Sequence, residues 1–177
     1  SSTVFCVCKP TSCNLCPKGA YCPNATSQIL CPKGTFNNIT GQTTETSCKT
    51  CLSSYVTLLN GAASCSICNK GAYCPNATSQ ILCPKGTFNN ITGQTTETSC
   101  KTCSIGYVEL SGGATACSIC NKGAYCPNAK SQILCPKGTF NNITGQTIVT
   151  LCKTCSIGYV SLSTGATACS ICNKGAY

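Results

Sequence analysis

An internal repeat dominates the chain. Thirty-three consecutive residues, 19–51, recur unchanged at 71–103 and recur with four changes at 123–155. The repeating unit is 52 residues long and carries six cysteines at fixed positions. Internal repetition decides the architecture before any local pattern does, because each copy folds as a small unit against its neighbours. A repeated unit also suits length, valency or a repeated surface better than catalysis, which needs one site.

The repeat divides the sequence into consecutive segments without spacers. We expect an N-terminal leader, three copies and the start of a truncated fourth, at residues 1–12, 13–64, 65–116, 117–168 and 169–177. Since no Pro/Gly/Ser-rich linker separates the copies, each should abut the next and pack only on its neighbours, as in a quasi-one-dimensional rod. The array stops one residue before its next expected cysteine, so we interpret the chain as part of a longer protein.

Cysteine is the residue type that most limits the fold class. The 177 residues include 22 Cys and no Trp, Met or His. A unit of this size with few large apolar residues cannot bury a sufficient core and needs covalent staples. So many thiols, together with repeated Asn-x-Thr sequons, indicate an oxidising, extracellular setting, either secreted or at the cell surface. A membrane contact would need an anchor outside this sequence, because no run of about 20 apolar residues is present.

Local patterns predict hairpins and exclude helices. In copy two, residues 86–95 predict a strand, a turn and a strand, and residues 107–117 predict a second hairpin. A proline follows Cys74 and Cys83, which argues against helix there. The expected fold class is a small disulfide-rich repeat protein, an elongated array of short β-hairpins and loops with little or no α-helix. Copy one has Leu-Ser-Ser at 52–54 where the others have Ser-Ile-Gly, so its hairpin there is expected to differ.

The disulfide connectivity stays open at the level of sequence. Six cysteines allow fifteen connectivities, and spacing alone does not choose among them. A linear array favours local closure, in which the second Cys of each doublet pairs with the next Cys along the chain. This simplest ladder predicts the pairs Cys16–Cys22, Cys31–Cys48, Cys51–Cys65, Cys68–Cys74, Cys83–Cys100, Cys103–Cys117, Cys120–Cys126, Cys135–Cys152 and Cys155–Cys169.

The ends of this ladder leave cysteines with alternative partners. Cys13 would pair with Cys6 or Cys8, and one of those two would be left over. Cys172 either pairs with a residue of a longer chain or bonds the spare leader cysteine of a neighbouring chain, head to tail.

Metal binding is the competing interpretation of the cysteines. The doublets at 48–51 and 65–68 have spacing near that of a four-cysteine zinc site. That site would leave Cys74 and Cys83 without a role. A redox-active Cys-x-x-Cys is weaker still, since no βαβ pattern surrounds any doublet. We therefore expect no metal and no cofactor, only covalent N-glycans.

Motifs within residues 83–120 resemble a known class of repeat. They read Cys-Pro-Lys-Gly-Thr-Phe-Asn-Asn-Ile-Thr-Gly-Gln, then Cys-Lys-Thr-Cys-Ser-Ile-Gly-Tyr-Val, then Gly-Gly-Ala-Thr-Ala-Cys-Ser-Ile-Cys. This pattern is similar to the ephrin-receptor-like cysteine-rich repeat, with the tumour-necrosis-factor-receptor-like modules as looser relatives. The near-identical copies also resemble the repeats of protist surface proteins, such as ciliate immobilisation antigens. The resemblance implies an elongated, disulfide-laddered ectodomain.

Glycosylation sequons recur in register with the repeat. Five sequons fall at two fixed places of the unit, at Asn24 and Asn76 and at Asn38, Asn90 and Asn142. Copy three loses the first place, because Lys130 replaces the sequon Thr after Asn128. The second place lies in a predicted hairpin bend, the exposed setting that glycosylation needs. The alternative is that these Asn residues simply serve turns.

Charges and aromatic residues are evenly spaced rather than clustered. The net charge of +9 comes from single lysines, among them Lys33, Lys85, Lys137, Lys49, Lys101 and Lys153. Without Arg and stacked aromatics we expect no nucleic-acid binding. A solvated surface is favoured, with weak attraction to acidic polysaccharide as the alternative. The recurring Phe36, Phe88 and Phe140, and Tyr21, Tyr73 and Tyr125, should cover disulfides; a sugar-stacking platform is the alternative.

Copy three differs from copy two at one apolar cluster. It carries Ile148, Val149 and Leu151 in place of Thr96, Glu97 and Ser99. Exposed apolar clusters usually mark contacts, so we expect a partner or another subunit there. The alternative is drift at a locally covered site.

The sequence favours a structural role. With no His or Asp and three scattered Glu, it lacks acid–base groups for an enzyme. We expect an extracellular, glycosylated structural repeat protein that self-associates into a stalk, surface coat or filament. The alternative is a receptor-like ectodomain that binds a protein ligand along its length. Ligand recognition should diversify successive copies, and these copies are nearly identical.

Overall fold

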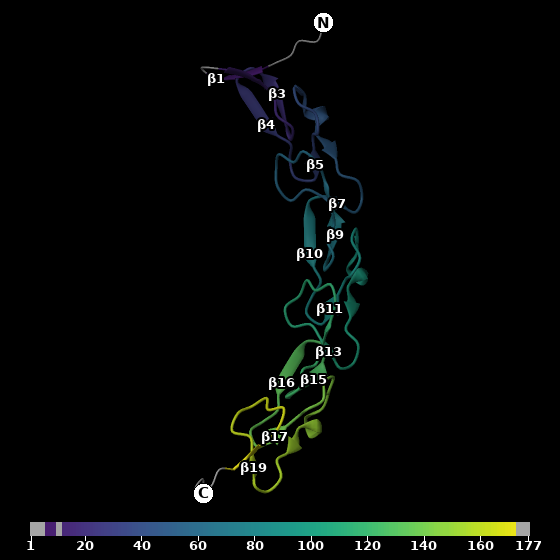
Figure 1. Cartoon of the computed structure of the whole chain (residues 1–177). Helices are drawn as coiled ribbons and strands as arrows, with labels where there is room; N and C mark the ends of the chain where they lie inside the picture. Colours follow the sequence, from purple (N-terminus) through teal and green to yellow (C-terminus); the bar gives the residue numbers. More distant parts are fainter. Residues whose placement is uncertain (1–5, 10–11, 173–177) are drawn as a thin grey trace. The chain divides into compact units, whose positions relative to one another are not determined.

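Short hairpins make up the regular structure of the chain (Figure 1). The computed structural model describes residues 6–9 and 12–172, with side chains from residue 14 onward. Within these residues every sheet is a two-stranded antiparallel hairpin, and the three helices are single 3-10 turns, with no α-helix. The predicted fold class, a small disulfide-rich repeat of short β-hairpins, is therefore confirmed.

Three kinds of hairpin recur with the repeat. In the first kind, which we call the sequon hairpin, the first strand ends at the asparagine of the first sequon place. It comprises β3 (Ala20–Asn24) with β4 (Ser27–Leu30), β9 (Ala72–Asn76) with β10 (Ser79–Leu82), and β15 (Ala124–Asn128) with β16 (Ser131–Leu134). The Phe hairpin comprises β5 (Thr35–Phe36) with β6 (Lys49–Thr50), β11 (Thr87–Phe88) with β12 (Lys101–Thr102), and β17 (Thr139–Phe140) with β18 (Lys153–Thr154).

The Tyr hairpin completes the repeat. It comprises β7 (Tyr55–Val56) with β8 (Ser66–Ile67), β13 (Tyr107–Val108) with β14 (Ser118–Ile119), and β19 (Tyr159–Val160) with β20 (Ser170–Ile171). The leader forms one further hairpin, β1 (Cys6–Lys9) with β2 (Ser12–Leu15), which contacts β3 as β7 contacts β9. The leader hairpin therefore occupies the place of a Tyr hairpin in front of copy one.

The chain divides into two compact units. Unit 1 comprises residues 1–81 and 91–99, and unit 2 comprises residues 82–90 and 100–177.

A long loop connects the two strands of each Phe hairpin. Each loop contains one 3-10 turn, namely η1 (Glu45–Ser47), η2 (Glu97–Ser99) or η3 (Val149–Leu151).

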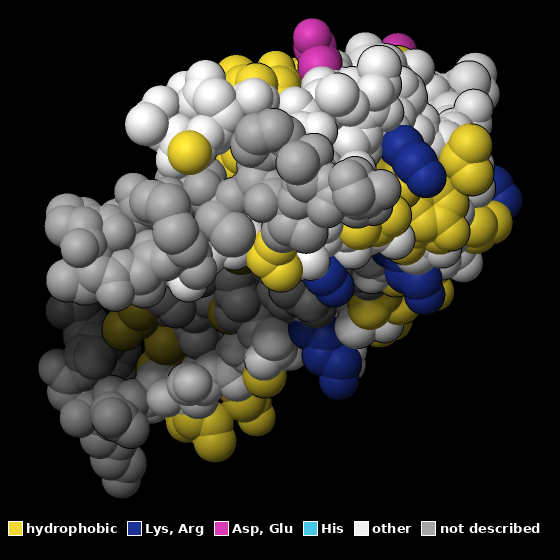
Figure 2. All heavy atoms as spheres, turned by 90° about the horizontal axis from the view of Figure 1, so that it is seen from above, with side chains coloured by type: hydrophobic (Ala, Val, Ile, Leu, Met, Phe, Trp, Pro, Cys, Tyr) yellow, Lys and Arg dark blue, Asp and Glu magenta, His cyan; other side chains and the backbone are white. Residues whose placement is uncertain are grey.

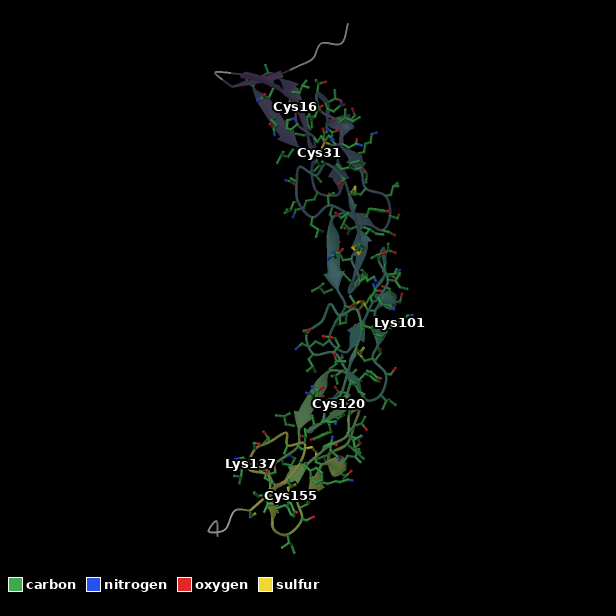
Figure 3. The ribbon with its side chains drawn as sticks, viewed as in Figure 1. Cys16, Cys31, Lys101, Cys120, Lys137 and Cys155 are labelled. Atoms are coloured by element: carbon green, nitrogen blue, oxygen red, sulfur yellow. A yellow bond between two sulfur atoms is a disulfide. The ribbon has the colours of Figure 1, made fainter. Side chains whose placement is uncertain are left out.

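Disulfides lie within each of the two units (Figure 3). The nine bridges of the described residues join the same nine pairs that the local-closure ladder predicts, four in unit 1 and five in unit 2. Cys172 is a free, exposed thiol, and the side chains of Cys6, Cys8 and Cys13 lie outside the described part. The two cysteines of each bridge are separated by 6, 14 or 17 positions in the sequence, so every bridge closes a short loop.

The buried interior contains no large side chain. Its hydrophobic members among the described residues are half-cystines together with Ala20, Ala72, Ala124, Val56 and Val108. Isoleucine and leucine lie instead at the surface, as at Ile105 and Leu59, which are 91% and 76% exposed. Sulfur therefore replaces the aliphatic core that a unit of this size cannot assemble.

Glycines allow neighbouring hairpins to approach closely. Gly19 has a φ of +78°, and a Cβ built on it would lie 2.0 Å from the carbonyl oxygen of Gly61. Copy three repeats this contact, since a Cβ on Gly123 would lie 2.1 Å from the oxygen of Gly165. Real Cβ atoms do not approach backbone oxygen so closely, so only glycine fits at these two positions.

Two predicted strand pairings are wrong. Residues 86–95 do not form a hairpin, because β11 pairs with β12 across a long loop. In copies one and three the buried Asn37 and Asn141 end the strand: their Nδ2 groups donate to the carbonyl oxygens of Ala20 and Ala124, each at 2.8 Å. The second hairpin does begin at Tyr107, but its return strand, Ser118–Ile119, lies beyond the predicted range of residues 107–117.

The Leu-Ser-Ser turn of copy one keeps the conformation of the Ser-Ile-Gly turn in copy two, contrary to expectation. The N–H of Tyr55 donates to the oxygen of Leu52 at 3.1 Å, as Tyr107 donates to Ser104 at 3.0 Å. Ser54 takes a φ of 74°, close to the 83° of Gly106. The turn is therefore kept, with a serine in the left-handed region that glycine occupies in copies two and three.

Replacing this serine should stabilise the protein. Ser54→Gly relieves a left-handed conformation that costs a non-glycine residue about 1–2 kcal/mol, partly offset by greater freedom of the unfolded chain. We expect the free energy of unfolding, measured by denaturant titration with the disulfides intact, to rise by about 0.5–1 kcal/mol. Gly158→Ala is the matched control, because nothing lies within 4 Å of its Cβ position, and it should be destabilising. A Ser54→Gly protein no more stable than the parent would contradict the strain assignment.

Candidate functional site

The first sequon place lies at the turn of the sequon hairpin. In copy one, Asn24 faces Ser27 across the hairpin, and its Oδ1 accepts hydrogen bonds from the N–H and the Oγ1 of Thr26, both at 3.0 Å. Asn76 Oδ1 accepts the same bonds from Thr78 at 2.9 and 2.8 Å. Both Asn side chains are exposed. The turn thus uses the carbonyl oxygen of the amide, while the nitrogen that would carry a glycan takes no part in these bonds.

Copy three shows that this turn does not need the sequon threonine. Asn128 Oδ1 still accepts from the N–H of Lys130 at 2.9 Å and from the Oγ of Ser131 at 2.8 Å. The structural role of the asparagine is therefore preserved where the sequon is lost. A turn role and a glycan-acceptor role are compatible at Asn24 and Asn76.

The second sequon place lies in the long loop and not in a hairpin bend. Asn38, Asn90 and Asn142 are exposed, and each directly follows an asparagine that is 3% exposed. The Oδ1 of buried Asn37 accepts from the N–H of Ile39 at 3.0 Å, so the chain turns outward at Asn38. These buried asparagines were not predicted from the sequence, although the repeated Asn-Asn pair after Phe was a visible signal.

The apolar cluster of copy three lies on the surface. Ile148, Val149 and Leu151 are 56%, 49% and 36% exposed, so the alternative of a locally covered site is wrong for these residues. The backbone matches that of copy one, with φ and ψ of −129° and 148° at Ile148 and −124° and 149° at Thr44. The three replacements thus change the surface and not the loop.

A groove recurs beside the sequon hairpin. In unit 1 it has a volume of about 510 Å³ and is lined by residues 50–55, 74–77 and 95–96. In unit 2 the corresponding groove has a volume of about 360 Å³ and is lined by residues 102–107, 126–129 and 147–148. Asn76 is part of the first wall and Asn128 is part of the second, so the sequon position faces this groove in both units.

Lysine and aromatic side chains follow the repeat as well. The recurring lysines are exposed, and Figure 2 shows lysine side chains standing between hydrophobic and uncharged side chains on the face drawn there. Phe36 lines a hollow of about 270 Å³ with Leu52, Tyr55 and the half-cystine Cys65. The recurring phenylalanine therefore lies beside a disulfide.

One carboxylate has an organised environment. Glu109 Oε1 accepts from the N–H of Ser111 at 2.8 Å, from the Oγ of Ser111 at 2.7 Å and from the N–H of Gly112 at 3.1 Å. The backbone N–H of Ser111, followed by its hydroxyl, holds the pKa of Glu109 below its ordinary 4.5. This carboxylate orders the loop of the Tyr hairpin in copy two.

The cysteines of the zinc interpretation lie in disulfides. The three bridges concerned are Cys31–Cys48, Cys51–Cys65 and Cys68–Cys74. No set of four thiolates is therefore available there. Across the described ranges, no three or more His, Cys, Asp or Glu side chains form a metal-binding group. No helix in the same part of the chain is both long and apolar enough to cross a membrane.

No family of known proteins matches the chain, and no curated protein matches its sequence. The resemblance to ephrin-receptor-like repeats stays a prediction.

The environment of Glu109 predicts a pH dependence. Because the folded pKa is lowered, the stabilisation is complete above the ordinary pKa of 4.5 and is lost as the pH falls through the folded pKa. In a ¹³C NMR titration of the Glu109 carboxyl, Ser111→Ala should move the midpoint upward, toward 4.5, since one donor is removed. Ser163→Ala, at the corresponding position of copy three, should leave it unchanged. A midpoint unaffected by Ser111→Ala would contradict the assignment.

Proposed function

We propose that the chain is an extracellular, glycosylated structural repeat protein that serves in a stalk, surface coat or filament. The observation that carries this proposal is the ladder of nine locally closed disulfides around an interior without large aliphatic side chains. Such bridges persist in oxidising compartments, which supports a secreted or cell-surface location. Bridges that close short loops also make each repeat stiff, as an extended scaffold requires.

The arrangement of the sequons supports the same role. All five acceptor asparagines are exposed, and they recur at fixed places of the repeat. Glycans at these positions would decorate successive copies alike and keep a protein with many exposed apolar residues soluble. We propose self-association of such chains as the route to a coat or filament, with any membrane contact made through an anchor elsewhere. No enzymatic, metal-dependent or nucleic-acid-binding role is proposed.

A receptor-like ectodomain is the second candidate. It is favoured by differences between copies at exposed positions. Copy one exposes Leu52 and Leu59, at 79% and 76%, where copy two has Ser104 and Ser111. Diversified apolar residues on a repeated scaffold suit recognition of a protein ligand.

Electron microscopy of the purified native protein separates the two candidates. A structural role predicts regular fibres or a layered coat with lateral glycan density, because near-identical copies present the same surface at each repeat. Single, dispersed particles at all concentrations would support the receptor-like role instead.

Mass mapping of glycopeptides from the same material supplies the control. The five sequon asparagines should carry glycans, whereas Asn128 and the buried Asn37 should not, since neither begins a sequon. Unmodified sequons throughout the secreted protein would contradict the glycosylated part of the proposal.

A further inference from the structure

The changes of copy three within the 33-residue stretch lie at or next to one groove. Of the four differences within the 33-residue repeat, Ile148 forms part of the unit 2 groove wall, Val149 and Leu151 lie in η3 directly after it, and Lys130 follows the wall residue Ala129. Figure 1 shows this region of unit 2 around β13, β15 and β16. Copy three also differs at Ser161 and Thr164 in the more variable part of the repeat, but within the 33-residue stretch all four changes lie at or next to this groove, which independent drift would not be expected to produce.

We propose that the unit 2 groove, together with the apolar cluster of η3, binds an acidic polypeptide segment that carries apolar side chains. Two exposed isoleucines from different segments line the groove. Ile105, at 91% exposed, lies in the turn between β12 and β13, and Ile148 directly precedes η3. The unit 1 groove has Ser53 and Thr96 at these two positions and Leu52 where unit 2 has Ser104, so the unit 2 groove has two of these apolar side chains and the unit 1 groove has one. Tyr107 and Pro127 add to the apolar lining of the unit 2 groove.

The apolar cluster brings no gain to the fold itself. In copy one, Ser47 Oγ donates to the carbonyl oxygen of Thr44 at 2.6 Å, and the hydroxyls of Thr44 and Thr46 are 2.9 Å apart. Ile148 and Leu151 cannot form these bonds, although the N–H of Leu151 still donates to the oxygen of Ile148 at 3.2 Å. Copy three thus forfeits side-chain hydrogen bonds and exposes apolar surface, which is the pattern of a contact surface.

Loss of the sequon at Asn128 means that no N-glycan can be attached in the unit 2 groove. Asn76 lies in the wall of the unit 1 groove and begins a sequon, so a glycan there would stand in the groove. Asn128 lies in the corresponding wall of unit 2, but Lys130 abolishes its sequon. The groove that gains apolar side chains is therefore also the one that carries no glycan acceptor.

Charge selects the kind of partner. The groove wall contains no charged residue, but Lys101 and Lys130 directly adjoin the wall residues Thr102 and Ala129, and the Lys130 side chain lies over Gly86. The acidic residue beside the wall is Glu109, whose N–H donates to the oxygen of Ala129 and whose carboxylate is held by Ser111 and Gly112. An acidic segment complements this surface. A second copy of the chain does not, since it carries twelve Lys or Arg against three Asp or Glu. An acidic polysaccharide would satisfy the lysines but would leave the isoleucines unused.

The test uses the secreted full chain and synthetic peptides that alternate Glu with Leu and Phe. These peptides should shift the NMR methyl signals of Ile105, Ile148 and Leu151. Peptides with Lys in place of Glu, or Ser in place of Leu and Phe, should not. The triple variant Ile148→Thr, Val149→Glu and Leu151→Ser should weaken binding at least about tenfold. It is expected to fold, because copy two has these residues in the same 3-10 turn, where Ser99 N–H donates to Thr96 at 3.2 Å.

Three further variants serve as controls. Leu162→Ser removes an apolar side chain of copy three that is 77% exposed and outside the groove, and it should leave binding unchanged. Lys130→Thr recreates a sequon at Asn128, so the glycosylated form should lose binding and trimming of the glycan should restore it. Lys130→Gln separates loss of the charge from gain of the glycan. The experiment with Lys130→Thr rests on the proposed glycosylation, whereas the peptide titrations do not. A failure of the proposed function and a failure of the proposed peptide binding can therefore be told apart.

Three results would overturn the inference. One is the absence of methyl shifts at Ile105 and Ile148 with the acidic apolar peptides. Another is peptide binding that the triple variant does not weaken. The third is a sulfated polysaccharide that shifts the groove signals when the peptides do not, which would assign the surface to polysaccharide.

Discussion

Covalent closure of short loops is the constraint on which the rest of the structure depends. Each repeat contains only alanine, valine and half-cystine in its hydrophobic interior, within the described part of the chain. Burial of so little apolar surface cannot offset the conformational entropy of ordering the repeat. Local disulfides lower that entropy in the unfolded chain instead. Because the bridges fix the backbone, isoleucine and leucine are released from the core and remain at the surface.

This division of roles explains why copies can vary in surface without varying in fold. Ile148, Val149 and Leu151 replace polar residues on an unchanged 3-10 turn, and Ser54 occupies a turn that glycine forms elsewhere. A scaffold held by sulfur tolerates such changes, since no buried packing depends on them. We propose that such an array presents a uniform, glycosylated surface along most copies and a distinct binding surface on one.

The sequence predicted what depends on linear order and missed what depends on distant contacts. The strand at Tyr107 and the local disulfide pairs follow from neighbours along the chain. The pairing of Thr87–Phe88 does not, because in the matching loops a buried asparagine bonds a carbonyl 17 residues away. No local pattern encodes that contact. Likewise, the sequons were visible as motifs, but only the structure shows that Asn76 and Asn128 face matching grooves.

Disulfide mapping of the secreted protein by mass spectrometry, without prior reduction, tests the central claim most directly. We expect peptides linked in the nine consecutive pairs, from Cys16–Cys22 to Cys155–Cys169, and no thiol at any of these eighteen positions. Free thiols at these positions, or bridges that skip a neighbouring cysteine, would contradict the account.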